Sequence, residues 1–309
     1  MSKRILLFLV LIILAVFVLS NLHSLSEGII YYVIPAVTYS PTLGQLVSRT
    51  GRFASVYDLV QLRNIDRRDH IVKHLDSPNI SVTQIPIPDS ETTDMFARFN
   101  STGPYTIFCA HYDKYHDDAN FQGASDNTSG VSVLLAAAQA LASRGNAGDF
   151  AFLFTGEEET GLRGAAAFVD YARANHILIR DIVDFDSLGR DALAIRPSAD
   201  QPGFFFALPF GVDIAFDGSA FQRGRAYPLA NARLTQSLLR AQPDLVVLQR
   251  FTALSDSNVF QANGIDTVAI SSSNMYYLQL TWDTYADRVE LLDERNLEKA
   301  YELIMEQVN

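Results

Sequence analysis

Short apolar runs that alternate with helix-like segments most strongly constrain the fold of this chain. Residues 105–110, 150–155 and 182–185 are expected to be buried strands, because their side chains are largely apolar, as in a sheet covered on both faces. Helical patterns follow at 127–142 and 164–175. This alternation predicts an α/β fold, a three-layer sandwich with a mostly parallel central mixed sheet.

The other segments extend the same pattern. Residues 55–75 have helical spacing, and 81–85 and 95–99 have the pattern of an antiparallel pair of strands. Further strands are expected at 192–195 and 267–271, and further helices at 235–241 and 293–308.

Acidic and histidine-bearing motifs follow most of the expected strands, in a fixed order along the chain. In open α/β sheets, binding sites form at the carboxyl ends of the strands. Imidazole and carboxylate groups brought together there are the ligands that a divalent cation requires. The sequence therefore predicts a metal site built from four motifs, which are AHYD with His111 and Asp113, GASDNTSG with Asp126, TGEEETGLRG with Glu158 and Glu159, and VDFDSLG with Asp186.

Each motif taken alone also has an ordinary structural interpretation. His111 could hydrogen-bond to nearby backbone, Asp126 could cap the helix that follows it, and Asp186 could lie on the surface. Asp113 could instead orient the His111 ring as a hydrogen-bond acceptor. The carboxylates at 157–159 are harder to explain without a metal, because adjacent like charges at the end of an apolar strand repel one another unless a cation is present.

Taken together, the motifs resemble those of the co-catalytic zinc aminopeptidase family, whose relatives include bacterial leucyl aminopeptidases, plasma glutamate carboxypeptidase and glutaminyl cyclases. The similarity covers roughly residues 95–305. It is carried by His-x-Asp at 111–113, Gly-Ala-x-Asp-Asn-x-Ser-Gly at 123–130, Glu-Glu-x-Gly-Leu-x-Gly at 158–164, Asp186 with Gly189, and Ser255-Asp256 with Phe260.

The resemblance implies a zinc-exopeptidase-like fold and a set of site roles. His111, Asp126 and Asp186 would hold one zinc ion, and Asp126 would bridge to a second ion that Glu159 also binds. Glu158 would be the catalytic general base. The implied activity is that of a metal-dependent peptidase, an aminopeptidase that hydrolyses N-terminal residues of peptide substrates with a zinc-activated water.

One position departs from the family motif. Four residues before Asp283-Thr284, where the family has a histidine, this chain has Gln279, and no histidine follows His176. A neutral amide oxygen is a poor zinc ligand beside imidazole or carboxylate. We therefore expect one firmly held zinc ion and a second that is weak or absent, with His116 as a less favoured replacement ligand.

The departure leaves three interpretations open. The chain is a one-metal hydrolase, a two-metal hydrolase completed by Gln279 or water, or a catalytically degenerate aminopeptidase-like domain that acts as a binding or scaffold protein. The net charge of −11 and the lack of a basic stripe argue against a nucleic-acid partner.

The N-terminus predicts export. Lys3 and Arg4 precede an unbroken apolar run from Ile5 to Leu19, which indicates a membrane anchor or signal peptide over residues 1–22. A connector over 23–50 and a zinc aminopeptidase-like catalytic domain over 51–309 would follow. The basic residues favour a catalytic domain on the exported side, anchored in the membrane through the N-terminal segment, or secreted or periplasmic if that segment is cleaved.

Overall fold

The computed structural model describes residues 44–308, with gaps at 100, 146–147, 197–203, 209–211, 217–231, 249–253, 275–277 and 279–280. The expected anchor over 1–22, most of the connector and the Gln279 position lie outside the described residues. Within the described ranges, no helix is long and apolar enough to cross a membrane.

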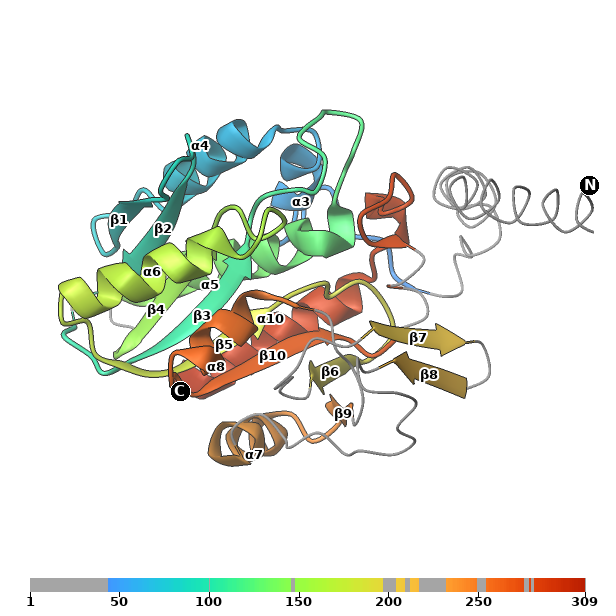
Figure 1. The fold of residues 1–309 in the computed structure, drawn as a ribbon. Helices are drawn as coiled ribbons and strands as arrows, with labels where there is room; N and C mark the ends of the chain where they lie inside the picture. Colours follow the sequence, from blue (N-terminus) through green and yellow to red (C-terminus); the bar gives the residue numbers. More distant parts are fainter. Residues whose placement is uncertain are drawn as a thin grey trace, which may run out of the picture.

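A mixed sheet of eight strands forms the centre of the described structure, in the order β1-β2-β4-β3-β5-β10-β6-β9 (Figure 1). The four inner strands β4, β3, β5 and β10 run parallel, and the pairs β1/β2, β2/β4 and β10/β6 are antiparallel. A separate hairpin pairs β7 with β8. The strands are β1 (Ser81–Pro86), β2 (Thr93–Arg98), β3 (Tyr105–His111), β4 (Phe150–Thr155), β5 (Ile179–Phe185), β6 (Leu193–Arg196), β7 (Phe204–Leu208), β8 (Val212–Phe216), β9 (Val246–Val247) and β10 (Thr267–Ser272).

The inner strands are apolar because helices cover both faces of the sheet. Successive side chains of β3 enter different cores, with Phe108 in one and Ile107 and Cys109 in the other. In Figure 1, α6 (Arg163–Ala174) and α8 (Asp256–Ala262) lie in front of the sheet, and α5 (Gly130–Arg144) and α10 (Glu294–Val308) lie behind it. This arrangement confirms the expected three-layer α/β sandwich.

Most of the expected elements are present, and the differences are local. The expected helix over 55–75 is two helices, α3 (Ser55–Leu59) and α4 (Asn64–His74). Between them the backbone of Arg63 is extended, and the carbonyl of Leu59 accepts the backbone N–H of Leu62 at 3.1 Å and Nε of the buried Arg67 at 3.0 Å. In a continuous helix that carbonyl would pair with the N–H of Arg63.

The expected helix over 127–142 begins later than expected, at Gly130. It is preceded by a distorted turn, η1 (Ala124–Ser129), in which Asp126 and Asn127 have non-helical backbone angles. The Asn127 side chain holds this turn, since it donates to the carbonyl of Phe185 at 2.7 Å and accepts the backbone N–H of Gly130 at 3.2 Å. The short helices η2 (Val289–Leu291) and α7 (Ala232–Ala241) complete the described elements.

Candidate metal centre

The predicted metal ligands come from the carboxyl ends of three neighbouring parallel strands. His111 is the last residue of β3, Glu158 and Glu159 follow β4, and Asp186 follows β5. Asp126 joins them from the η1 turn at the start of α5. The four sequence motifs therefore meet at one edge of the sheet, where the strand topology places such sites.

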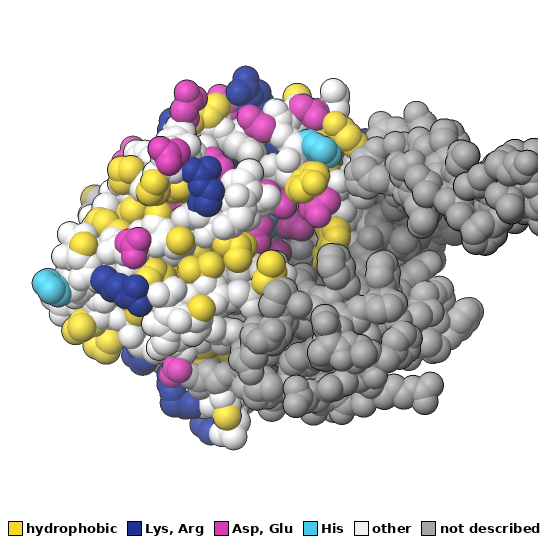
Figure 2. Space-filling view, viewed as in Figure 1, with side chains coloured by type: hydrophobic (Ala, Val, Ile, Leu, Met, Phe, Trp, Pro, Cys, Tyr) yellow, Lys and Arg dark blue, Asp and Glu magenta, His cyan; other side chains and the backbone are white. Residues whose placement is uncertain are grey.

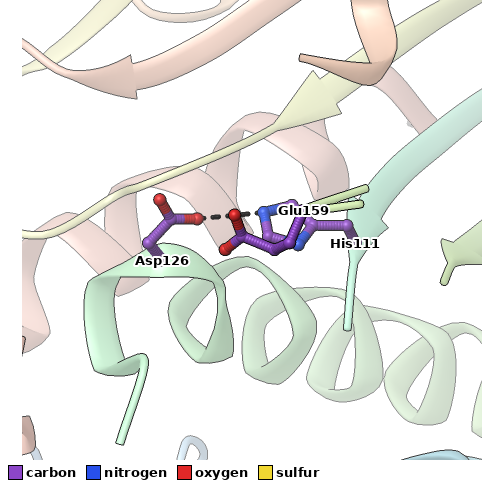
Figure 3. A group of neighbouring side chains, drawn as sticks. All are labelled: His111, Asp126 and Glu159. Atoms are coloured by element: carbon purple, nitrogen blue, oxygen red, sulfur yellow. Dashed lines mark hydrogen bonds and ion pairs between the residues drawn. The ribbon is translucent and has the colours of Figure 1, made fainter. Parts of the chain in front are cut away.

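Three of these side chains converge closely in Figure 3. The ligand atoms of His111, Asp126 and Glu159 all lie within 4.8 Å of one another. Nε2 of His111 is 3.0 Å from Oδ1 of Asp126 and 3.8 Å from Oδ1 of Asp186. An imidazole with several carboxylates in this arrangement fits the donor preferences of zinc.

Asp113 connects the His111 strand to the glutamate turn. Its two carboxylate oxygens accept the backbone N–H groups of Glu158 and Glu159, each at 3.1 Å. Its Oδ1 also lies 3.5 Å from Nδ1 of His111. Asp113 therefore fixes the backbone of both glutamates, and one of its oxygens lies near the His111 ring.

Glu157 makes a different set of contacts from Glu158 and Glu159. Its carboxylate accepts hydrogen bonds from Ser90 at 2.5 Å, from Thr92 at 3.0 Å and from Thr160 at 2.5 Å, and it lies 3.5 Å from Arg163. These partners lower the pKa of Glu157 although partial burial acts to raise it. The run of three glutamates is thus divided between one structural carboxylate and two site carboxylates.

Electrostatics in the site favour a bound cation. Glu158 and Glu159 keep some exposed surface, but protein encloses their carboxyl groups, and this enclosure is the main reason that both pKa values rise. Burial and repulsion from Asp126 raise the pKa of Glu159 to about 10. Burial also raises the pKa of Asp126, against the hydrogen bond from His111. A divalent ion would relieve this crowding of negative charge, so the residues present fit the metal that the sequence implies.

The pKa of His111 is raised, although burial acts on a histidine in the opposite direction to a carboxylate. Burial alone would lower the pKa of His111, yet the charge of Glu158 and the hydrogen bonds to neighbouring aspartates raise it well above 6.5. The carboxylates around His111 therefore favour its cationic form. A histidine binds zinc as the neutral imidazole, so metal binding would release a proton.

An outer layer of buried carboxylates supports the site. Asp287 accepts the backbone N–H groups of Ser125 and Asp126, and Asp256 accepts a hydrogen bond from Thr155. Burial, with repulsion from Asp126, raises the pKa of Asp283 to about 7. Asp283 of the last family motif, and Asp287 four residues further on, therefore lie close to Asp126.

The sequence did not identify Arg196 as a residue of the site. This buried residue ends β6 and donates from Nη1 to Oδ2 of Asp186 at 2.6 Å. Burial acts to raise the pKa of Asp186, but the hydrogen bond from His111 and the charge of Arg196 outweigh it and lower the pKa. A single arginine at the end of a short apolar strand gives no local signal of such a contact.

His116, the alternative ligand, lies in an aromatic cluster. Its ring stacks on Tyr285 with centroids 5.5 Å apart, and Phe121 packs edge-on at 5.1 Å. It is not a member of the group formed by His111, Asp126 and Glu159.

The family model for peptidase family M28 matches residues 95–308. The chain belongs to this family. Members of peptidase family M28 are metal-dependent peptidases, so the resemblance drawn from the motifs is confirmed, and zinc and peptide substrates are the cofactor and substrate class that the family implies. No curated protein sequence matches the chain.

Solved structures share the fold of this M28 domain. The LapA aminopeptidase of Legionella pneumophila superposes with a TM-score of 0.67 at 14% identity, over 85% of this chain and 71% of that chain. A glutaminyl cyclase of Porphyromonas gingivalis gives 0.60 at 18% identity, over 85% and 98%. The zinc aminopeptidase BSAP of Bacillus subtilis gives 0.52 at 20% identity, over 70% and 49%. At these identities the likeness establishes the fold.

Proposed function

We propose that this M28 domain is an aminopeptidase that removes N-terminal residues from peptides, with Glu158 as the general base. The observation that carries the proposal is the convergence of His111, Asp126 and Glu159 within 4.8 Å, directly beside a second glutamate whose backbone is fixed. His111, Asp126 and Glu159 would hold zinc, with Asp186 as a further ligand. Zinc, when bound, would polarise the scissile carbonyl and acidify water.

Glu158 is suited to accept a proton. The hydrogen bond from its backbone N–H to Asp113 fixes the main chain from which its carboxylate projects. Burial, together with repulsion from Asp256 and Asp186, raises the pKa of Glu158 well above 4.5, although His111 opposes the shift. A general base works best when its pKa approaches the working pH, and positive charge in the site would bring the raised pKa of Glu158 toward that range.

The charge of the site fits a substrate with a free amino terminus. Figure 2 shows Asp and Glu side chains gathered in a recess on one face of the described surface. A peptide ammonium group is attracted to such a recess, whereas a blocked, uncharged terminus is not. This preference distinguishes an aminopeptidase from an endopeptidase.

The proposal is tested with aminoacyl-4-nitroanilides and their N-acetylated counterparts. We expect the free-amine substrates alone to be hydrolysed, and Glu158→Gln to reduce kcat by roughly 10²- to 10⁴-fold, the usual contribution of a general base. Glu157→Gln is the matched control, because its carboxylate binds Ser90, Thr92 and Thr160 and not the site.

Two results would count against this function. Equal hydrolysis of acetylated substrates would exclude an aminopeptidase, and full activity in Glu158→Gln would exclude the assigned base. A parent protein that binds zinc and peptides without hydrolysing them would favour the degenerate binding domain instead.

A further inference from the structure

Arg196 reaches the metal centre across a neighbouring strand. In the sheet, Ala269 of β10 is paired with Asp184 of β5 on one side and with Arg196 of β6 on the other. Residues paired in this way share a face of the sheet. Because the side chain between them is only a methyl group, the arginine can extend over Ala269 toward Asp186, two residues beyond Asp184.

The contact that results is a short, buried ion pair. Nη1 of Arg196 lies 2.6 Å from Oδ2 of Asp186, and the exposed fractions of the two residues are 5% and 7%. The other oxygen, Oδ1, accepts a hydrogen bond from Ser187 at 3.0 Å and is the one that faces His111. One of the two oxygens of this predicted zinc ligand is therefore already bound to a cation.

This pairing changes what Asp186 can offer to a metal. A guanidinium keeps its charge in proteins, so its charge-assisted hydrogen bond to the carboxylate is permanent. The same positive charge also acts on Asp126 and Asp184. A carboxylate that is already neutralised donates less strongly to a metal, and a fixed cation beside it repels a nearby divalent ion.

We propose that Arg196 is the permanent counterion of Asp186, which makes Asp186 a weakened metal ligand and restricts the site to a single tightly held ion bound by His111, Asp126 and Glu159. The inference rests on the proposed function in one respect, that the site binds zinc. It goes beyond that function by assigning a role in metal affinity to a residue on β6 that belongs to none of the sequence motifs.

The test measures zinc binding to the purified protein by isothermal titration calorimetry and by metal analysis after dialysis. Arg196→Met keeps the length and the apolar stem of the side chain and removes its charge, whereas Arg196→Lys keeps the charge. We expect Arg196→Met to bind zinc about 10-fold more tightly, the scale on which groups that contact a ligand alter metal affinity. Arg196→Lys should bind zinc with an affinity close to that of the parent.

Thermal unfolding supplies a readout that does not depend on activity. Without zinc, Arg196→Met leaves Asp186 buried without its counterion, so its melting temperature should fall below that of the parent. Added zinc should then raise its melting temperature by more than it raises that of the parent. Zinc binding to Arg196→Met that equals or falls below the parent value would overturn the proposal, since Arg196 would then serve to position Asp186 as a full ligand.

Two ligand variants keep the proposal testable if Arg196→Met does not fold. Asp186→Asn should weaken zinc binding less than about 3-fold if Asp186 is a weakened ligand, whereas loss of a full ligand should cost at least the roughly 10- to 100-fold that is lost with a group that only orients a ligand. Asp126→Asn should abolish binding. A large loss of zinc affinity in Asp186→Asn overturns only the inference about Arg196. A parent protein that binds no zinc overturns both the metal site and the inference.

Discussion

Asp287 and Asp126 are joined by a hydrogen bond that spans most of the domain sequence. The Asp287 carboxylate accepts the backbone N–H of Asp126 at 2.9 Å, and it accepts that of Ser125 at 2.8 Å. Burial raises the pKa of Asp287 to about 7 although these two N–H groups act to lower it. A buried carboxylate kept at this cost is best explained by the need to orient the turn that carries Asp126.

Asp287→Ala should therefore weaken zinc binding without removing any predicted ligand. We expect a loss of roughly 10- to 100-fold in affinity, the range found when a group that orients a metal ligand is lost. Calorimetric titration with zinc measures the effect, and Asp244→Ala, an exposed carboxylate paired with Lys299, is the control. An unchanged affinity in Asp287→Ala would show that the turn holds its shape without this carboxylate.

The raised pKa of Asp94 should make the stability of the protein depend on pH. This buried residue on β2 accepts the backbone N–H of Gly156 at 3.0 Å, and burial raises its pKa to about 8. Between the unfolded pKa of 3.8 and about 8, the folded state holds more protons at this group than the unfolded state, so stability falls as pH rises through this window. One such group contributes a slope of up to about 1.4 kcal/mol per pH unit.

Urea unfolding of the metal-free protein at several pH values between 5 and 8 tests this prediction. Asp94→Asn removes the titration and keeps an oxygen for Gly156, so its stability should vary less with pH than that of the parent. Parallel curves for the two proteins would mean that Asp94 ionises at its ordinary pKa.

Gly164 fixes the glutamate turn against α6. A Cβ at this position would clash with the carbonyl oxygen of Gly156 and lie 2.5 Å from Oδ1 of Asp94. Because backbone and a buried carboxylate cannot yield as a flexible side chain would, Gly164→Ala should destabilise the protein by about 3 kcal/mol. Ala166→Ser, on the exposed side of the same helix, adds an atom in open space and should change the free energy of unfolding by less than about 0.5 kcal/mol. Denaturant midpoints of the two variants should therefore differ clearly, and similar midpoints would refute the steric account.

The sequence was most informative where burial and chemistry act locally. The strand at Phe150–Thr155 was predicted because sheet covering on both faces leaves a continuous apolar run. The convergence of His111, Asp126 and Glu159 was predicted because most of the motifs follow a strand, and parallel strands end at the same edge of the sheet. The motif glycine at Gly164 now has a steric reason that the sequence alone did not supply.

Contacts between distant segments account for most of what the sequence did not reveal. At the break between α3 and α4 the carbonyl of Leu59 is bound by Arg67, whose guanidinium also donates to the carbonyls of Tyr112 and Gln122, each at 2.9 Å. Helix α8 was missed because it is short and because its capping box has Asn258, which accepts the backbone N–H of the N-cap residue Ser255, in place of the more recognisable Glu or Gln. The pairing of Arg196 with Asp186 likewise arises only when three strands are brought together.

The two departures from a full two-metal site should act on different ions. Gln279 replaces the histidine expected beside Glu159, and Arg196 occupies an oxygen of Asp186. Gln279→His alone restores one ligand set but leaves Asp186 paired, so a second zinc ion should bind only when zinc is in excess. Combined with Arg196→Met, it should raise the zinc that remains after dialysis from about one to about two ions per chain, because both ligand sets are then complete.

Metal analysis of four proteins, the parent, the two single variants and the double variant, tests whether Arg196 and Gln279 each limit the number of bound zinc ions. If Gln279→His alone retains two ions, Arg196 does not limit occupancy, and if neither Gln279→His nor the double variant gains zinc, residue 279 is not at the ligand position.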